Sequence, residues 1–384
     1  DMAPDRYEVT VIGEEPWGNY NRIMLSPVLS GEKTIDDIML HPHAWYSDKG
    51  IKFIADDPAV KIDRPRKVVY TEKGEKVDYD RLIIATGSSP FVPPVEGADL
   101  KGVISFRDIY DVNTMIKYCE TKKNAVVIGG GLLGLEAAYG LKQRGMNVTV
   151  LHLMDRIMER QLDGRASRML RQSIEQKGIN IITEANTEAL IGKKGHVSQV
   201  RLKDDTVLDA DLVVFAVGIR PNIALAQSAG LRCNRGVLVN DTMQTFDPSI
   251  YAVGECIEHR NQTFGLVEPL WGQAFVCATH LAEHGSLTFK SPTVPTQLKV
   301  SGVDVFSAGN IEPKEDYEDI ILNDEKRQIY KRIIIQKDKV IGAVLFGDTE
   351  DGMWYAELIA DQTPIVSFRN KLLFGKDFAM KKAG

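Results

Sequence analysis

Short apolar runs that end at glycine recur along the 384-residue sequence. Residues 125–128 read AVVI and are followed directly by glycines, and residues 147–151 (NVTVL) form a second such run. Short apolar runs bounded by glycine are typical of strands that are buried on both faces of a parallel sheet. The residues between them, 132–145, predict a helix, so this stretch reads as a β-α-β unit.

The turn of this unit carries Gly129, Gly131 and Gly134, which have the spacing G-x-G-x-x-G. In a dinucleotide-binding turn the first glycine permits the tight bend, the second lets the backbone approach a pyrophosphate, and the third lets the helix pack on the strand. Leu133 lies in the first helical turn, whose unpaired N–H groups would face the phosphates. The spacing alone is weak evidence, but its β-α-β setting favours nucleotide binding over a structural turn.

The residue that closes the second strand normally selects the nucleotide, because a carboxylate there binds the ribose 2′-hydroxyl. This sequence has His152 at that place, with Arg156 nearby. An imidazole does not strongly repel a 2′-phosphate, so NADH and NADPH both stay open. A solvated histidine at a strand end is an equally good interpretation of His152.

Four further apolar runs end in turns that carry glycine or an acidic residue: residues 9–12, 82–84, 212–216 and 250–253. We predict strands for them, each followed by a turn. The turns carry the residues that the resemblance described below makes candidates for cofactor contacts, namely Glu14 and Glu15, then Ala85, Thr86 and Gly87, then Val217 and Gly218, and finally Gly254 and Glu255.

Composition and charge exclude several classes of function. A net charge of −6 and scattered basic residues do not favour nucleic-acid binding. No apolar run reaches membrane-spanning length and the N-terminus lacks a signal-peptide pattern, so we expect a cytoplasmic location and no membrane partner. The four cysteines form no Cys-x-x-Cys pair, so we expect reduced thiols and no metal site within this chain.

These motifs together resemble the two-dinucleotide-binding-domain flavoproteins, which include rubredoxin and ferredoxin reductases and NADH oxidases. The resemblance implies that Glu14 or Glu15 binds the ribose of FAD and that Thr86 and Gly87 pass beside FAD. It further implies that Glu255 holds the ribityl chain, although the family usually has an aspartate there.

A closer resemblance is to the N-terminal flavin region of the NAD(P)H-dependent nitrite reductase large subunit. It rests on four segments, namely NYNRIMLSPVLSGE, the stretch from GLLGLEAAYG to MERQLD, YAVGECIEHRNQTFGLVEPLWGQA and LLFGKD. It implies an α/β fold of two nested Rossmann-like domains, of the three-layer ββα type, followed by a small α+β domain. We expect an FAD-binding-type domain at residues 1–110 and 241–292, an NAD(P)H-binding domain at 111–240 and a reductase-type C-terminal domain at 293–384.

The first of these domains lacks an expected element in this sequence. If residues 7–13 form its second strand, the central strand and the glycine loop that precede it are not found. We expect a preceding segment to supply them, because unpaired backbone groups inside a domain are unfavourable. Whether this chain holds FAD without that loop stays open.

The resemblance also implies the chemistry, which is hydride transfer from the nicotinamide ring to the flavin. Glu136 occupies a position that the family places near the contact of the two rings, and Arg22 is the candidate for the positive charge that the family supplies with a lysine. Trp271, near the start of a helix that we expect to begin at Pro269, is predicted to stack on the flavin pocket or form its wall. The competing interpretation is a solvated glutamate and arginine and a tryptophan that packs in the core.

The residues from 293 onward predict strands and a hairpin at residues 337–339. The acidic stretch 312–325 is either a surface for an electron acceptor or a solvated charge run. The acceptors that the resemblance implies are iron–sulfur and sirohaem domains of the same parent protein or a small iron–sulfur electron carrier. The alternatives are a stand-alone rubredoxin or ferredoxin reductase and a flavin-free nucleotide-binding module, and a homodimer also stays open.

Overall fold

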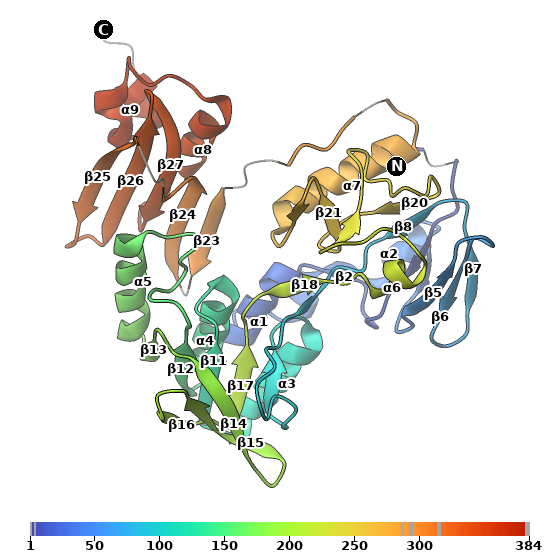
Figure 1. The fold of residues 1–384 in the computed structure, drawn as a ribbon, viewed down its shortest axis with the longest axis horizontal. Coiled ribbons are helices and arrows are strands. Elements are labelled where there is room, and N and C mark those ends of the chain that lie inside the picture. The colour runs from blue at the N-terminus through green and yellow to red at the C-terminus, as the bar shows by residue number, and fades with distance from the viewer. Residues whose placement is uncertain are drawn as a thin grey trace. The chain divides into compact units, whose positions relative to one another are not determined.

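The structure is a computed structural model that describes residues 2–3, 5–285, 287–291, 295–300, 302–312 and 316–380, without the side chains of residues 297–300. Its elements are labelled in Figure 1. The chain divides into two compact units. Unit 1 comprises Asp1–Val28, Lys33–Phe91 and Gly218–Pro292, and unit 2 comprises Leu29–Glu32, Val92–Val217 and Thr293–Gly384. The domain boundaries expected from the sequence stay predictions, and the one at residue 293 lies outside the described residues.

Among the described residues, the parallel strands of unit 1 lie in separate small sheets, where a single Rossmann sheet would be continuous. Strand β1 (Thr10–Ile12) pairs with β4 (Lys52–Ile54), and β8 (Leu82–Ile84) pairs with β20 (Ile250–Ala252). In the described residues β1 and β8 are not hydrogen-bonded to each other, and each has one strand neighbour. Each of these two pairs is therefore a short parallel sheet of its own.

Smaller sheets and helices complete unit 1. Two of them are an antiparallel sheet of three strands and an antiparallel sheet of two strands. Their strands are β5 (Ala59–Asp63), β6 (Val68–Thr71), β7 (Lys76–Asp78), β9 (Ser88–Pro90) and β18 (Ile219–Pro221). The other strands are β2 (Asn19–Tyr20), β3 (Met39–His41), β19 (Val237–Leu238), β21 (Ile257–His259) and β22 (Gln262–Thr263). The helices are η1 (Arg22–Met24), η2 (Asp36–Ile38), α2 (His43–Asp48), α6 (Ala224–Ser228) and α7 (Val267–Leu281), and α1 (Leu25–Ser30) crosses the boundary of the units.

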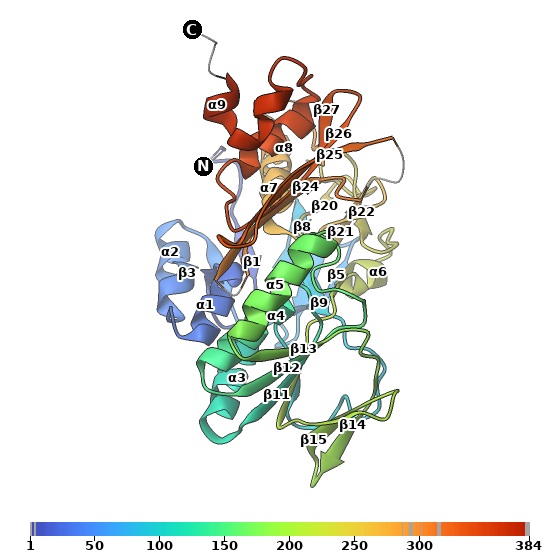
Figure 2. The same cartoon turned by 90° about the vertical axis from the view of Figure 1, so that its left-hand side faces the viewer.

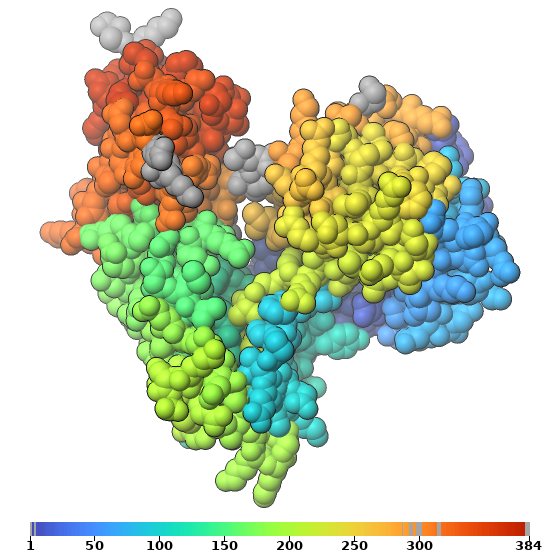
Figure 3. Space-filling model, viewed as in Figure 1, coloured from blue at the N-terminus to red at the C-terminus, as the bar shows by residue number. Residues whose placement is uncertain are grey.

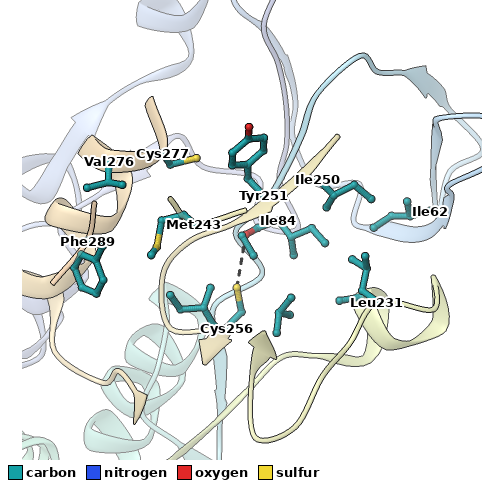
Figure 4. Close-up of a cluster of buried hydrophobic side chains, with 14 of the residues drawn as sticks. Ile62, Ile84, Leu231, Met243, Ile250, Tyr251, Cys256, Val276, Cys277 and Phe289 are labelled. Atoms are coloured by element: carbon teal, nitrogen blue, oxygen red, sulfur yellow. Dashed lines mark hydrogen bonds between the residues drawn. The ribbon is translucent and has the colours of Figure 1, made fainter. Parts of the chain in front are cut away.

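The core of unit 1 joins segments that are far apart in the sequence. Ile84 of β8 and Ile250 of β20 pack with Val276 and Cys277 of α7. Figure 4 shows this cluster and the contact of the Cys256 thiol with the carbonyl of Ile84, at 3.6 Å. Because the cluster is apolar and closed, it fixes the turns that follow β8 and β20 at neighbouring positions.

Unit 2 begins with a five-stranded parallel sheet in the order β10-β17-β11-β12-β13. Its strands are β10 (Val103–Ser105), β11 (Asn124–Ile128), β12 (Asn147–Leu151), β13 (Ile179–Ile182) and β17 (Leu212–Phe215). The helices α3 (Ile109–Thr121), α4 (Leu132–Gln143) and α5 (Gly164–Gln176) run beside it (Figure 2). The β11-α4-β12 unit therefore has the elements that the sequence predicts.

A second sheet covers part of the parallel sheet of unit 2. It is antiparallel and consists of β14 (Thr187–Lys193), β15 (His196–Leu202) and β16 (Val207–Asp209). Side chains of Val126 and Ile128 on β11 pack with Leu190, Val197 and Val200 of this second sheet. Two sheets and a layer of helices give the three-layer ββα arrangement, which confirms the predicted fold class. The tip of the β14–β15 hairpin projects into solvent (Figure 3).

The C-terminal part of unit 2 is an antiparallel sheet covered by helices, as expected of a small α+β domain. The sheet has the order β23-β24-β27-β26-β25. Its strands are β23 (Thr296–Val300), β24 (Val303–Gly309), β25 (Glu318–Asp324), β26 (Ile329–Gln336) and β27 (Lys339–Phe346), and the helices are α8 (Gly352–Asp361), η3 (Arg369–Phe374) and α9 (Lys376–Met380). The predicted hairpin is present, because Lys337 and Asp338 have φ of 48° and 55°, as a tight turn between β26 and β27 requires.

Candidate functional site

The glycine turn between β11 and α4 requires glycine at two of its three motif positions. Gly129 has φ of 127°, and a Cβ there would lie 2.2 Å from the carbonyl oxygen of Ala216. A Cβ on Gly134 would lie 2.0 Å from the carbonyl oxygen of Gly129. Both glycines thus let α4 pack against the strands, which is the role that the spacing predicts.

Gly131 differs from them, because nothing lies within 4 Å of the Cβ position at this residue. Gly131 is the N-cap of α4, and no side chain caps the helix. Leu133, in the first turn of α4, is 39% exposed. The start of α4 is therefore uncapped and open around Gly131, and an uncapped helix N-terminus of this kind can bind a phosphate.

His152 directly follows β12, but it is buried and not solvated, with 9% exposure. Its Nδ1 accepts a hydrogen bond from the Gly130 N–H at 3.0 Å, and its Nε2 lies 3.1 Å from Oε2 of Glu159. Arg156 pairs with Glu312 and lies 3.8 Å from Asp155. The structure thus brings His152 to the glycine turn but engages Arg156 with acidic side chains.

In unit 1, the turn after β8 is tied to the chain after β18. The Thr86 hydroxyl donates to the carbonyl of Asn222 at 2.7 Å, and the Asn222 side chain donates to the Thr86 carbonyl at 2.8 Å. The Asn222 N–H also donates to the Gly87 carbonyl, and Gly87 has a left-handed φ of 63°. Ala85 is exposed. These bonds hold the turn in one conformation beside the turn after β20.

The turn after β20 presents Gly254 and Glu255. Glu255 accepts a hydrogen bond from the Ser88 hydroxyl at 2.6 Å, and the Gly254 N–H donates to Oε1 of Gln273 at 2.7 Å. Gln273 is completely buried, and among the described residues its Nε2 has no hydrogen-bond partner. Because a buried amide donor without a partner is unfavourable, this atom marks a place where a polar ligand fits.

Glu15 and Arg22 form an ion pair at 2.6 Å, and Glu15 also accepts from the Tyr20 hydroxyl at 2.7 Å. Glu14 is exposed. The sequence predicts Arg22 as a partner of Glu136, which is half-buried on α4 in unit 2, and that role stays a prediction.

The remaining predicted residues lie at exposed positions or turns. Trp271 is 68% exposed and so does not pack in the core of unit 1. Val217 is 37% exposed, and Gly218 has φ of 111° with nothing within 4 Å of its Cβ position. The helix α7 begins at Val267, two residues before the predicted start.

The four cysteines are free thiols. Burial raises the pKa of Cys277 to about 12, and burial also raises the pKa of Cys119, Cys233 and Cys256. All four thiols therefore stay protonated at neutral pH, and none offers the thiolate that disulfide chemistry needs. Among the described residues no cluster of His, Cys, Asp and Glu is suited to hold a metal ion, and no helix is long and apolar enough to span a membrane.

Two family models match this chain in separate ranges. Residues 1–274 match the pyridine nucleotide-disulphide oxidoreductase model, and residues 295–363 match the rubredoxin NAD+ reductase C-terminal domain. The chain belongs to the pyridine nucleotide-disulphide oxidoreductase family. FAD and NAD(P)H are the cofactors of this family.

Named relatives agree with this membership. The chain is 46% identical to a nitrite reductase [NAD(P)H] of Bacillus subtilis (strain 168), over 95% of this chain and 45% of that protein. It is 41% identical to the assimilatory nitrate reductase electron transfer subunit of the same organism, over 96% of this chain and 48% of that protein. The chain thus spans about half the length of these relatives. A solved structure, the NADH:rubredoxin oxidoreductase of Clostridium acetobutylicum, superposes with a TM-score of 0.80 at 28% identity, covering 95% of this chain and 92% of that one.

The residues of this chain fit both cofactors of the family. The open position at Gly131 and the uncapped start of α4 fit the pyrophosphate of a nicotinamide nucleotide. The unpaired amide donor of Gln273 and the carboxylate of Glu255 fit polar atoms of FAD. For the FAD pyrophosphate, residues 1–9 contain no glycine turn.

Sequence reasoning missed three residues that the structure brings to these places, namely Asn222, Gln273 and Glu159. Gln273 carried a readable signal, because it is a polar residue within the apolar pattern of α7. The neighbouring apolar residue Ala274 is exposed, whereas Gln273 is buried. Glu159 carried no such signal, since a loop returns it to the strand end.

Proposed function

We propose that this chain is a flavoprotein oxidoreductase module that passes a hydride from NAD(P)H to FAD and then single electrons to an iron–sulfur or sirohaem acceptor. The observation that carries this proposal is the glycine turn, where the open Gly131 and the uncapped first turn of α4 offer backbone donors to a dinucleotide. The name of one Bacillus relative, a nitrite reductase, supports the further step to nitrite reduction, and the name of the other, an electron transfer subunit, supports the transfer of electrons to an acceptor.

The residues of the chain would position the cofactors and not react with them. The first turn of α4 would hold the pyrophosphate of NAD(P)H, and Glu136 on the same helix is the candidate residue near the reacting ring. Glu255, fixed by Ser88, and Gln273 would hold polar atoms of FAD. When bound, FAD supplies the conversion of a two-electron hydride into single electrons. Since the cysteines stay protonated, the electrons would leave for a partner and not for a thiol of this chain.

Two kinds of acceptor are consistent with the relatives. Iron–sulfur and sirohaem domains of the same parent protein are favoured by the nitrite reductase relative, of which this chain spans 45%. A small iron–sulfur carrier is favoured by the similarity to a solved NADH:rubredoxin oxidoreductase, and it gives the second candidate function, a stand-alone rubredoxin reductase.

Dye reduction with the purified chain and added FAD tests the proposal. The proposal predicts that NADH or NADPH drives rapid reduction of ferricyanide, a one-electron acceptor, and no reduction of an aromatic disulfide. Reduction of the disulfide at a comparable rate would contradict the absence of thiol chemistry. If neither acceptor is reduced although the nucleotide binds, the chain is a flavin-free nucleotide-binding module. Addition of rubredoxin then separates the two candidate functions, because only a rubredoxin reductase reduces it rapidly.

A further inference from the structure

We propose that Glu159 binds the ribose hydroxyls of the adenosine half of the nicotinamide nucleotide and gives this chain a preference for NADH over NADPH. His152, which replaces the usual carboxylate at the end of β12, acts as a positioning residue for Glu159. This proposal rests on the proposed function, because it concerns the same nucleotide site in unit 2. It starts from three contacts on Gly130.

The first contact fixes the tautomer of His152. The Gly130 N–H can only donate, so Nδ1 of His152 must accept, at 3.0 Å. A neutral imidazole with an accepting Nδ1 carries its proton on Nε2. That Nε2–H then donates to Oε2 of Glu159, at 3.1 Å. The imidazole therefore links the glycine turn to a carboxylate through two directed hydrogen bonds.

The other two contacts bring the loop after β12 back over the glycine turn. The Met158 N–H donates to the Gly130 carbonyl at 3.0 Å. A Cβ on Gly130 would lie 2.8 Å from Cγ of His152 and 2.9 Å from Cγ2 of Ile157, so both side chains lie directly against this glycine. Met158 is completely buried and has a left-handed φ of 53°. The loop is thus held tightly against the glycine turn, with Glu159 next to the buried Met158.

These contacts place a carboxylate beside the strand end where the nucleotide ribose is normally bound. In a dinucleotide-binding fold, an acid at the end of this strand hydrogen-bonds the ribose 2′-hydroxyl. His152 cannot serve as that acid, but its imidazole holds the carboxylate of Glu159 close to the strand end. The Glu159 side chain is 25% exposed. The chain thereby supplies the missing acid seven residues after the strand end.

The charges around the loop disfavour a 2′-phosphate. Glu159 would repel it, and the nearest arginine in the loop, Arg156, already pairs with Glu312 and lies near Asp155. Arg160 is exposed on the same loop, and it is the remaining cation of residues 152–160. Specificity for one nucleotide often depends on such a repulsive group against the other.

The test uses ADP-ribose and 2′-phospho-ADP-ribose, which bind without any flavin chemistry. Calorimetric titration of the full chain should give a dissociation constant for ADP-ribose at least about tenfold lower than for its 2′-phosphate. Glu159→Gln keeps the shape of the side chain and should weaken ADP-ribose binding by about tenfold, so that the two affinities become similar. Glu175→Gln, on α5 in an exposed ion pair with Arg171, is the matched control and should leave both affinities unchanged.

The positioning role of His152 is tested by comparing single and double variants at His152 and Glu159. His152→Ala should weaken ADP-ribose binding about as much as Glu159→Gln, and the double variant should be no weaker than either single variant. His152→Gln retains an acceptor and a donor and should restore part of the affinity. Far-UV circular dichroism checks the fold of each variant, and Glu159→Gln alone decides the proposal if His152→Ala is unfolded.

The outcomes separate this proposal from the proposed function. Equal or tighter binding of the 2′-phosphate by the unaltered chain, or unchanged binding by Glu159→Gln, overturns the role of Glu159 and leaves the nucleotide site in place. If a preference for ADP-ribose is abolished by Arg160→Gln but not by Glu159→Gln, the role of Glu159 is likewise overturned. If the unaltered chain binds neither ligand, the proposed function itself fails.

Discussion

The hydroxyl of Tyr330 on β26 donates a hydrogen bond of 2.7 Å to the carboxylate of Asp163, the N-cap of α5. Both residues are buried, with 3% and 6% exposure. Asp163 also accepts from the Ala166 N–H at 2.9 Å and from Arg332 at 3.3 Å. One buried acid therefore caps a helix of the nucleotide-binding domain and attaches the C-terminal sheet to it.

Substitutions at this acid should rank by the number of bonds they remove. Tyr330→Phe removes one hydrogen bond and should lower the free energy of unfolding by about 1 kcal/mol. Asp163→Asn keeps a capping oxygen but loses the charge beside Arg332, and Asp163→Ala loses the cap as well, which adds about 1 kcal/mol to the destabilisation. Urea unfolding measures the order Ala, Asn, Phe from least to most stable, with the exposed Glu318→Gln as control. Equal stabilities of the three variants would contradict the double role of Asp163.

Substitution by alanine should affect stability at one glycine of the nucleotide turn and nucleotide binding at another. Gly134→Ala places a Cβ 2.0 Å from the Gly129 carbonyl oxygen, so it should destabilise unit 2 by about 2 kcal/mol or more. Gly131→Ala meets no atom within 4 Å and has φ of −82°, so its stability should stay within about 1 kcal/mol of the unaltered chain. A methyl group there would enter the space that we propose for the pyrophosphate, so NADH binding should weaken. Thermal unfolding and nucleotide titration of both variants check this contrast, and a stable Gly134→Ala would contradict it.

Asp111 should make the stability of unit 2 depend on pH. Burial, with a contribution from the charge of Asp108, raises the pKa of Asp111 to about 6. The folded state therefore binds more protons than the unfolded state between about pH 4 and 6, and the free energy of unfolding falls as the pH rises through that window. Asp111→Asn removes this dependence. Its free energy of unfolding should therefore rise by about 1–2 kcal/mol relative to that of the unaltered chain between pH 4 and 7.

Asp108→Asn is the matched control for Asp111. Asparagine still caps α3, whose first turn Asp108 caps through the Asp111 N–H at 2.9 Å, but it removes the neighbouring charge. The pH window of destabilisation should then shift to lower pH without disappearing. Urea unfolding at several pH values measures both variants, and a pH-independent difference between Asp111→Asn and the unaltered chain would contradict the raised pKa.

The elements around the nucleotide turn could be predicted from the sequence because their signals are local. The apolar run that became β11, the glycine spacing and the helix α4 follow one another within residues 124–143, and each restricts the backbone by itself. The hairpin at Lys337 and Asp338 is of the same kind.

The contacts of the site were less readable, because they join residues through loops. The pairing of His152 with Glu159 depends on a left-handed Met158 that reverses the chain, and no residue type requires that conformation. Gln273 was missed because it is a single polar residue between the apolar positions that identify α7, and a polar side chain does not by itself predict burial. The apolar pattern of a helix gives its period but not the position of a single polar residue on its edge.

Gln273 offers a test of the unit 1 site. Gln273→Met conserves the volume but leaves the Gly254 N–H without an acceptor, so it should destabilise unit 1 by about 1–3 kcal/mol. It also removes the amide donor that fits FAD, so the chain should retain less FAD after gel filtration. Ala274→Ser, at the neighbouring exposed position, is the control and should change neither quantity. Unchanged FAD retention in Gln273→Met would contradict the assignment of this amide to the cofactor.

Anaerobic titration of the chain with NADH in the presence of FAD, followed by visible absorbance, tests the central claim most directly. The account predicts that FAD remains with the chain after gel filtration and that its absorbance band disappears as about one equivalent of NADH is added per bound flavin. A chain that binds NADH but leaves the band of added FAD unchanged would contradict the claim that this protein passes a hydride to a flavin.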